Sequence, residues 1–323
     1  MSKPHIIMTG TMLDELDLPI DAEFEVHRAS QQPDPATFLK SVSDDIIGIA
    51  HTGGGLKMSA ETIEALPNLR IIANFGVGYD SIDVRSAAAR NIVVTNTPDV
   101  LTEEVADTAL GLLLMTVREL GAAEQWLRAG KWTGVGNYPL TPLTLRGRKV
   151  GIVGLGRIGL AIAKRCEAFG LTVAYHSRSQ KPAVPYAYFS DVVAMAEAVD
   201  TLIIITPGTP ETQNMIDARV LRALGSNGVL INIARGSVVD ETALKQALRD
   251  RVIFAAGLDV MWNEPHIDPE LMTLPHCVLL PHVGSASVAT RIGMGQLVID
   301  NLVAYKTRSM PLTPVPETPF NGW

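Results

Sequence analysis

The sequence has 323 residues, of which 27 are Lys or Arg and 34 are Asp or Glu, so its formal net charge is −7. This acidic balance offers no basic surface for nucleic acid, and no nucleic-acid partner is expected. With 47% hydrophobic residues the chain can bury a large core. Its length exceeds the roughly 250–300 residues at which one core usually divides, so two domains are expected.

The cysteine content and the apolar runs indicate where the protein works. Cys166 and Cys277 are too few for a disulfide framework and lie in no Cys-x-x-Cys or Cys/His cluster. We therefore expect no metal site and a reduced, cytoplasmic location. The apolar run at residues 109–117 is far shorter than the ~18 residues that span a bilayer, and the first residues show no signal-peptide pattern, so no membrane association is predicted.

The first third of the chain alternates short β-prone runs with amphipathic stretches, which is typical of βαβ units in a parallel sheet. Strands are predicted at residues 5–8, 46–50, 71–73 and 92–94, and helices at residues 59–66 and 83–90. A long buried helix is then predicted over residues 102–120. Thr102 can cap it, and Glu103 and Glu104 favour the dipole of its first turn.

The same alternation restarts at Lys149. Strands are predicted at residues 150–153, 171–175, 202–205, 229–233, 253–258 and 278–280. A helix over residues 288–305 returns the chain to the first unit, and the proline-rich tail after it is expected to be irregular. The predicted fold class is therefore α/β, with two doubly wound, Rossmann-like parallel sheets. One domain is expected to comprise residues 1–98 and 288–323, and the other residues 99–287.

A glycine-rich turn follows the predicted strand at residues 150–153. It consists of Gly154, Leu155, Gly156, Arg157, Ile158 and Gly159. The first glycine permits a tight turn, the second lets the backbone approach a pyrophosphate at a helix N-terminus, and the third allows close helix–strand packing. Such a motif alone is weak evidence, but its place between a strand and a helix predicts a dinucleotide site.

The turn after the next strand indicates which dinucleotide binds. NAD-binding proteins place an acidic residue there to hold the ribose 2′-hydroxyl. This chain instead has Ser177, Arg178 and Ser179. A guanidinium between two hydroxyls can hydrogen-bond a 2′-phosphate, so NADP(H) is expected to be preferred over NAD(H). The alternative is that Arg178 is a solvated loop residue without a ligand.

Three polar residues fall near the ends of later predicted strands, where open α/β sheets bind ligands. They are Arg235, Glu264 and His282. Hydride transfer to a 2-keto acid needs a cation for the carboxylate and an acid for the carbonyl oxygen. Arg235 suits the first role and His282 the second, with Glu264 keeping the imidazole protonated near neutral pH. Taken singly, each could also be a surface, turn or structural residue.

These segments, together with residues 76–80 and 96–102, resemble the D-2-hydroxyacid dehydrogenases over essentially the whole chain. The resemblance implies a discontinuous substrate-binding domain that clamps a dinucleotide-binding domain, an active site in the cleft between them, and a homodimer. Trp132 would reach the partner subunit's active site or pack in a core or interface.

The resemblance also implies ligand contacts. The Ile233 carbonyl and Asp259 would face the nicotinamide carboxamide. The other expected cofactor contacts are Pro207, Thr212 and Gly284. Substrate contacts are expected from Gly54, Gly55, Val77 and Gly78, together with Arg235 and His282. For the two glycines after residue 53, a plain flexible turn is the alternative.

Within the family, residues 97–102 and the turn at residues 177–179 resemble NADPH-preferring glyoxylate/hydroxypyruvate reductases and plant-type hydroxyphenylpyruvate reductases. The expected reaction is reduction of glyoxylate and hydroxypyruvate to glycolate and D-glycerate. Reduction of hydroxyphenylpyruvate or another larger 2-keto acid is the alternative, because the two subgroups differ mainly in pocket size. A dinucleotide-sensing binding protein is an alternative of another class, since such relatives keep the Arg/Glu/His set.

Overall fold

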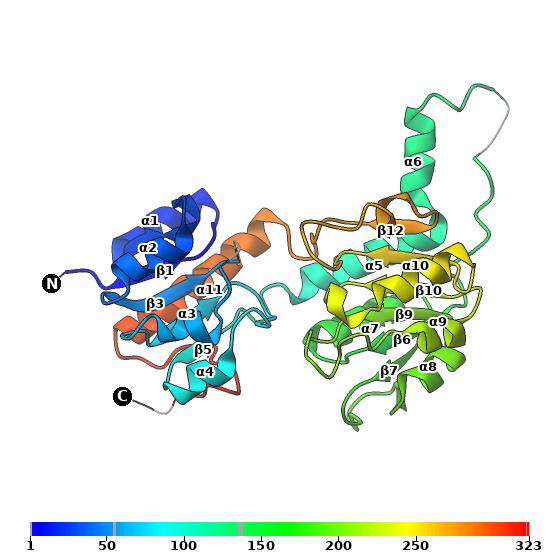
Figure 1. Ribbon diagram of the computed structural model, residues 1–323. Helices are drawn as coiled ribbons and strands as arrows, with labels where there is room; N and C mark the ends of the chain where they lie inside the picture. The colour runs from blue at the N-terminus through cyan, green and yellow to red at the C-terminus, as the bar shows by residue number, and fades with distance from the viewer. Residues whose placement is uncertain (1, 54–55, 135–137, 321, 323) are drawn as a thin grey trace. The chain divides into compact units, whose positions relative to one another are not determined.

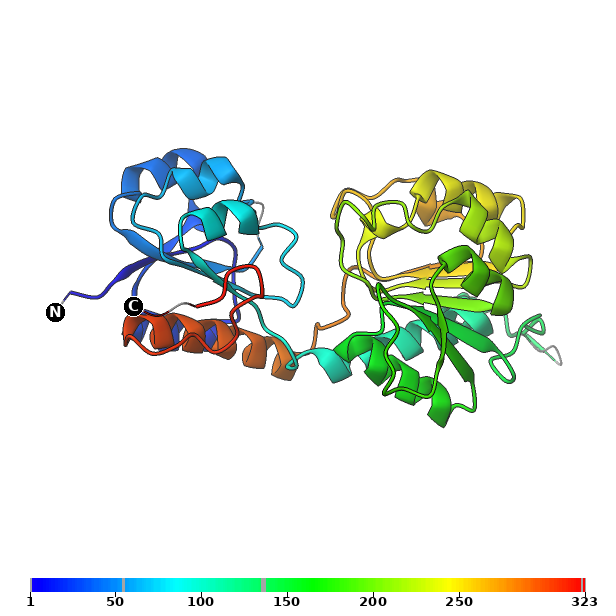
Figure 2. The same cartoon turned by 90° about the horizontal axis from the view of Figure 1, so that it is seen from below.

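The computed structural model describes residues 2–53, 56–134, 138–320 and 322, and its chain divides into two compact units. The first unit comprises Met1–Leu101 and Ala286–Trp323, and the second comprises Thr102–Ser285. Each unit contains one parallel sheet with helices on both faces (Figures 1 and 2), which confirms the predicted fold class. The helices described are all too short or too polar to span a bilayer.

The sheet of the first unit has the strand order β2-β1-β3-β4-β5, and every pairing is parallel. Its strands are β1 (His5–Met8), β2 (Glu25–Arg28), β3 (Ile46–His51), β4 (Ile71–Asn74) and β5 (Val93–Thr95). Its helices are α1 (Asp17–Glu23), α2 (Pro35–Val42), α3 (Ala60–Glu64), α4 (Val84–Ala89) and α11 (Val288–Lys306). The predicted strands and helices are all present, whereas β2, α1 and α2 were not predicted.

The strands of this sheet are apolar on both faces because helices cover both. Ile7 and Ile49 pack on the side of α2, α3 and α4. Ile6 and Ile71 pack on the other side, against α1 and the apolar face of α11. Strands buried in this way read as continuous apolar runs rather than as alternating patterns, which is why the sequence predicts them.

The second unit has a seven-stranded parallel sheet of order β12-β11-β10-β9-β6-β7-β8. Its strands are β6 (Lys149–Val153), β7 (Thr172–His176), β8 (Ala187–Phe189), β9 (Thr201–Ile204), β10 (Val229–Asn232), β11 (Ala255–Leu258) and β12 (Cys277–Leu279). Its helices are α5 (Thr102–Arg118), α6 (Leu120–Arg128), α7 (Arg157–Ala168), α8 (Val192–Ala198), α9 (Ala218–Leu224) and α10 (Glu241–Arg249). Helices α5 and α7 cover one face, and α8, α9 and α10 cover the other.

The helix predicted over residues 102–120 is broken near its end. Helix α5 stops at Arg118, and Glu119 takes a left-handed φ of 52° before α6 begins. Thr102 is the first helical residue, and its buried hydroxyl has no hydrogen-bond partner among the residues described, so the predicted cap is wrong. The helix begins at Thr102 itself rather than after it, so Thr102 lies in the first turn and is not the capping residue. An ion pair of 2.6 Å from Arg165 to Asp107 joins α7 to α5.

The tail after α11 lies along β5, the edge strand of the first sheet. It forms no helix in its described residues, as predicted, but one antiparallel bridge joins Pro314 to Thr95. Thr313 Oγ1 donates to the Asn96 carbonyl at 2.6 Å, and Thr318 Oγ1 accepts from the Val94 amide at 2.9 Å. The tail therefore pairs with an edge that would otherwise present free backbone groups.

Candidate active site

The predicted functional residues of the second unit follow the C-terminal ends of parallel strands. Adjacent strands end in register, because Val153 of β6 pairs with His176 of β7 and with Ile204 of β9. The turns that follow them therefore lie side by side along one edge of the sheet. The chain leaves β6 for β7 on one side and returns as β9 on the other, so the strand order reverses between β6 and β9. Open α/β sheets bind ligands at such a reversal.

The glycine-rich turn lies at this reversal, between β6 and α7. Gly154 has a φ of 107°, and a Cβ there would lie 2.8 Å from the Ile205 carbonyl oxygen. A Cβ at Gly159 would lie 2.2 Å from the Gly154 carbonyl oxygen, so only glycine lets α7 approach the turn. A Cβ at Gly156 would instead meet nothing within 4 Å. The turn thus leaves open space in front of the N-terminus of α7.

This space fits the pyrophosphate of a dinucleotide. Gly156 precedes α7 and offers no side-chain cap, and a helix N-terminus of this kind attracts an anion. Leu155 is buried behind the turn, Ile158 is half-buried and Arg157 is exposed. The glycine turn therefore combines a helix N-terminus with room for a ligand to approach it.

The turn after β7 is joined directly to the glycine turn, because the Gly154 amide donates to the His176 carbonyl at 2.9 Å. Ser177 Oγ donates to the Ser179 carbonyl at 2.7 Å and closes the turn around Arg178. Arg178 and Ser179 are exposed. The structure thus places an exposed guanidinium and two hydroxyl-bearing residues beside the glycine turn.

The loop after β9 links the predicted cofactor residues to Arg235. Thr212 Oγ1 donates to the Pro207 carbonyl at 2.7 Å, which ties the two ends of the loop together. Between them, a Cβ at Gly208 would lie 3.0 Å from Cγ of Arg235. The loop therefore packs on the Arg235 side chain, which is half-buried.

His282 and Glu264 are joined by a direct hydrogen bond of 2.7 Å between His282 Nδ1 and Glu264 Oε2. The other carboxylate oxygen accepts from the Met261 amide at 2.8 Å. Burial opposes ionisation of Glu264, but these two hydrogen bonds and the charges of His282 and Arg235 lower its pKa overall. The structure therefore brings Arg235, Glu264 and His282 into one electrostatic site with an ionised carboxylate.

Asp259 fixes the turn that carries His282. It is 1% exposed, and its two carboxylate oxygens accept from the Val283 amide at 2.7 Å and the Gly284 amide at 2.9 Å. Burial raises the pKa of Asp259, and the two amides oppose that shift. His282 itself has a left-handed φ of 53°, and its amide donates to the Asp259 carbonyl. Ile233, which is also buried, lies against the same turn near Gly284.

Asn232 was not singled out from the sequence, yet it shapes the turn that presents Arg235. It ends β10 and is 1% exposed. Its Nδ2 donates to the Arg235 carbonyl at 2.9 Å, and its Oδ1 accepts from the Ala234 amide at 3.1 Å. The available signal was an amide side chain at the end of an otherwise apolar strand.

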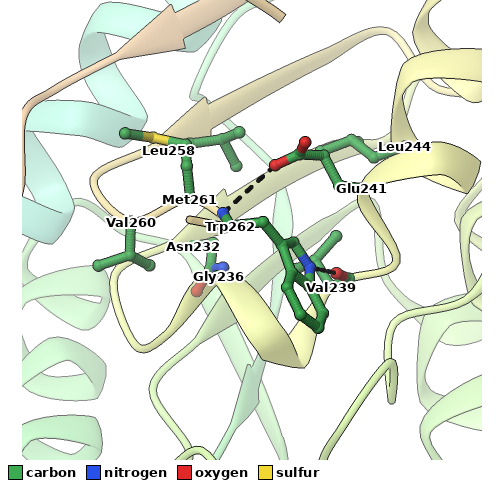
Figure 3. A pocket seen from close by; sticks show the side chains of 9 residues that line it. All are labelled: Asn232, Gly236, Val239, Glu241, Leu244, Leu258, Val260, Met261 and Trp262. Carbon is green, nitrogen blue, oxygen red and sulfur yellow. Dashed lines mark hydrogen bonds between the residues drawn. The ribbon is translucent and has the colours of Figure 1, made fainter. Parts of the chain in front are cut away.

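A small pocket lies beside the loop that carries Glu264 (Figure 3). The indole of Trp262 donates to the Val239 carbonyl at 2.8 Å, and its backbone amide donates to Glu241 Oε2 at 3.3 Å. With a volume of about 10 Å³, the pocket holds at most about one water, so it does not take a substrate. Its lining residues are Asn232, Gly236, Val239, Glu241, Leu244, Leu258, Val260, Met261 and Trp262.

The predicted substrate residues of the first unit follow β3 and β4. Gly54 and Gly55 lie outside the described residues. In the loop after β4, Asn74 Nδ2 donates to the Gly76 carbonyl and Asn96 Nδ2 donates to the Val77 carbonyl, both at 3.0 Å. Because a trans peptide directs its N–H opposite its C=O, the amides of Val77 and Gly78 point away from these asparagines. They are available to an anion on the other side.

Comparison with known proteins gives consistent matches. The NAD-binding domain model of the D-isomer specific 2-hydroxyacid dehydrogenases matches residues 110–284. A solved NADPH-dependent glyoxylate/hydroxypyruvate reductase from Sinorhizobium meliloti, in complex with NADP and malonate, is 52% identical with a TM-score of 0.92, covering 99% of this chain and 98% of that one.

Two curated relatives match at nearly full length. A glyoxylate/hydroxypyruvate reductase from Arabidopsis thaliana is 43% identical over 98% of this chain and 100% of its own length. A hydroxyphenylpyruvate reductase from Plectranthus scutellarioides is 42% identical over 96% of this chain and 98% of its own length. Both of the substrate subgroups that the sequence resembles are thus represented among these relatives.

Proposed function

Because the chain belongs to the D-isomer specific 2-hydroxyacid dehydrogenase family, we propose that it catalyses the NADPH-dependent reduction of glyoxylate and hydroxypyruvate to glycolate and D-glycerate. The observation that carries this proposal is the hydrogen bond of 2.7 Å between His282 and an ionised Glu264, in a site shared with Arg235. These groups follow strands of the same sheet edge as the glycine turn.

The three side chains have separate roles in the proposed reaction. Arg235 binds the carboxylate of the keto acid and polarises the neighbouring carbonyl. NADPH, when bound, supplies the hydride that adds to the carbonyl carbon. His282 donates a proton to the carbonyl oxygen, which becomes the hydroxyl of the product. Since its Nδ1 bonds Glu264, the nitrogen left to face the substrate is Nε2.

Glu264 acts on this reaction through His282. Its carboxylate bonds Nδ1 in either protonation state of the ring, so it keeps the imidazole in one orientation. The imidazolium is the form that can give up a proton to the substrate, and Glu264 accepts a hydrogen bond from its Nδ1. Asp259 supports both effects by holding the backbone of the turn at residues 282–284.

We further propose that the second unit binds the dinucleotide and prefers NADPH. The exposed Arg178 beside the glycine turn supports this preference, because a guanidinium can hydrogen-bond a 2′-phosphate. The first unit is proposed to supply the contacts to the substrate carboxylate. The outward-directed amides of Val77 and Gly78 support that role.

We also propose that the protein is a homodimer in which α6 packs against a second copy of the chain. Helix α6 has no buried residue, and it projects from the body of the second unit (Figure 1). Leu127 and Trp132 are 53% and 59% exposed. They line a hollow of about 230 Å³ with Ala123, Trp126 and Tyr138. Light scattering should give twice the chain mass, and Leu127→Glu should lower it.

The two cysteines support a location in the reducing cytoplasm. Both thiols are free. Burial raises the pKa of Cys166 and of Cys277 to about 12, so both stay protonated and unreactive at neutral pH. Such thiols suit a compartment in which no disulfide is required.

Oxidation of NADPH and NADH by the purified protein tests the function directly. The panel should contain glyoxylate, hydroxypyruvate, pyruvate and 4-hydroxyphenylpyruvate. Fast turnover of the two small acids with NADPH is expected. Preference for the aryl acid would leave the mechanism in place but reassign the substrate. Tight NADPH binding without turnover of any acid would contradict the proposal and favour a dinucleotide-sensing protein.

A further inference from the structure

A chain of hydrogen bonds joins the ends of β1 and β3 in the first unit, where its strand order reverses. Thr9 follows β1 and His51 ends β3, and the two residues are 1% and 2% exposed. His51 Nδ1 lies 3.2 Å from Thr9 Oγ1, and His51 Nε2 lies 2.9 Å from Ser81 Oγ. Thr9 Oγ1 also donates to the Gly53 carbonyl at 2.9 Å. One imidazole thus stands between two loops.

The hydrogen bonds of Thr9 determine which atom donates in each hydrogen bond of this network. The hydroxyl proton of Thr9 is committed to the Gly53 carbonyl, and its oxygen accepts from the Thr52 amide at 3.0 Å. Thr9 can therefore only accept from His51, so Nδ1 carries the ring proton. In a neutral ring Nε2 is then bare and accepts from the hydroxyl of Ser81. The arrangement therefore selects one tautomer of the neutral imidazole.

The neutral form is the one that burial favours. Burial lowers the pKa of His51 to about 4, so the ring stays uncharged throughout the neutral pH range. The direction of the hydrogen bonds is therefore constant under the conditions in which a cytoplasmic enzyme works.

The two loops joined by His51 are those that precede and follow β4. The loop after β3 begins with Thr52 and Gly53. The loop after β4 runs through Val77 and Gly78 to Ser81, and its first amide, that of Phe75, donates to the His51 carbonyl at 2.9 Å. The Met58 amide adds a second link, because it donates to the Ser81 carbonyl at 3.1 Å. The position of each loop thus depends on the other.

We propose that His51 is a positioning residue that holds the Thr52–Gly53 turn and the loop at residues 76–81 in a fixed relation, and so sets the affinity for the substrate carboxylate. The inference rests on the proposed function, because it takes the amides of Val77 and Gly78 as the carboxylate contacts. His51 itself needs no contact with the substrate. It acts through the two loops that it bridges.

The same sheet offers a matched control. His5 Nδ1 lies 3.1 Å from His27 Nε2, and both residues lie on β1 and β2 rather than in either loop. His27, like His51, is an imidazole hydrogen-bonded inside the first unit. Its replacement tests what the loss of such a bond does to the fold without touching the loops.

The experiment compares steady-state kinetics of His51→Gln, Thr9→Val, Thr9→Ser and His27→Gln, using glyoxylate and NADPH. The loss of about one buried hydrogen bond should raise KM for glyoxylate roughly three- to tenfold in His51→Gln and Thr9→Val. The value of kcat and the Kd for NADPH should stay within about twofold, because only substrate binding is affected. Thr9→Ser keeps the hydroxyl and should restore KM, and His27→Gln should leave it unchanged.

The possible outcomes separate the positioning role of His51 from the proposed function. Unchanged KM in folded His51→Gln and Thr9→Val, with an active wild type, would overturn the positioning role and leave the proposed function intact. A wild type that turns over none of the acids would overturn both. Nitrogen NMR of the wild type gives an independent check, since it should show a protonated Nδ1 and a bare Nε2 for His51. The opposite tautomer would overturn the proposed arrangement whatever the kinetics.

Discussion

The two sheets reverse their strand order in the same way, but the two points of reversal differ. In the second unit, between β6 and β9, a Cβ at Gly156 would meet nothing within 4 Å. In the first unit, between β1 and β3, hydrogen bonds close the gap. The Gly10 amide donates to Thr52 Oγ1 at 2.8 Å, and the Thr52 amide donates to Thr9 Oγ1.

This difference shows that topology alone does not make an anion site. An anion needs free N–H groups, and the side chains of Thr9 and Thr52 consume them in the first unit. In the second unit α7 begins at Arg157, directly after the glycine turn, whereas the first unit reaches α1 only at Asp17. The same strand order thus gives an open phosphate site in one unit and a braced pair of loops in the other.

The largest expected effect tests whether His282 of the second unit donates the proton. Replacing His282 by Gln should lower kcat for glyoxylate reduction roughly 10²- to 10⁴-fold, because the general acid is lost. The Kd for NADPH, measured by fluorescence titration, should not change. The exposed His266 lies in the same region, and His266→Gln is the matched control that should keep full activity. Near-full activity of His282→Gln would move the acid to another residue.

The stability of the protein at acid pH should depend on His51, which lies where the strand order of the first unit reverses. Unfolded His51 takes a proton below pH 6.5, whereas burial keeps its pKa at about 4 in the fold. The contribution of His51 to the free energy of unfolding is therefore fully present above pH 6.5. It falls as the pH drops toward 4, by up to about 3 kcal/mol. Denaturant unfolding of the wild type and His51→Gln at several pH values measures it. The wild type should lose more stability over this range, and equal slopes would contradict the assignment.

The affinity of the second unit for NADPH should depend on Arg178. A charged hydrogen bond contributes about 1.5–3 kcal/mol, so Arg178→Ala should weaken NADPH roughly 10- to 150-fold and leave NADH nearly unchanged. Calorimetric titration with both dinucleotides gives the comparison. Arg146→Ala, which removes another exposed arginine of the second unit, should affect neither. Equal losses for NADPH and NADH would remove the 2′-phosphate assignment.

The open space itself can be filled with one methyl group. A Cβ at Gly156 would meet no atom of the described residues within 4 Å, and the backbone there has an ordinary negative φ, so Gly156→Ala should fold with unchanged stability. It should weaken NADPH by roughly tenfold or more, because the backbone can no longer approach the pyrophosphate. Gly111→Ala in α5, where a Cβ also meets nothing within 4 Å, is the control. Unchanged NADPH affinity would place the dinucleotide elsewhere.

The smallest effect concerns the pH profile. Glu264→Gln keeps the shape of the side chain but removes the negative charge beside His282, so the imidazolium is less favoured. The pH above which reductase activity declines should therefore move down. The pH dependence of kcat/KM for the wild type and the variant measures it. An unchanged profile would show that the 2.7 Å contact serves only orientation.

The sequence predicts the apolar strands, including the edge strands β5 and β12, and misses two other edge strands. Strands covered on both faces must be apolar, and such runs stand out. The two edge strands that it misses, β2 (Glu25–Arg28) and β8 (Ala187–Phe189), are partly exposed, so they carry no such signal. The bend at Glu119 was missed because a left-handed φ at a non-glycine residue has no sequence signature.

The candidate site shows the same limit. The glycine turn and the positions of Arg235, Glu264 and His282 are predicted from the sequence, because each lies near the end of a predicted strand. The residues that hold them were found only in the structure. Asn232 bonds to Arg235 within the turn that follows β10. His51 bonds to Ser81 in the loop after the neighbouring strand β4, and such a partner depends on which strands lie next to each other. The first-unit loops remain the least predictable part for that reason.

The pairing of the tail with β5 has a consequence for how the chain is made. One face of the first sheet is covered by α1 together with α11, and both α11 and the tail that pairs with β5 come from residues 286 onward, as the orange and red segments in Figure 2 show. The second unit is continuous and can fold on the ribosome as soon as it emerges. The segment translated first therefore keeps part of one sheet face and the edge at β5 uncovered until α11 and the tail have been translated.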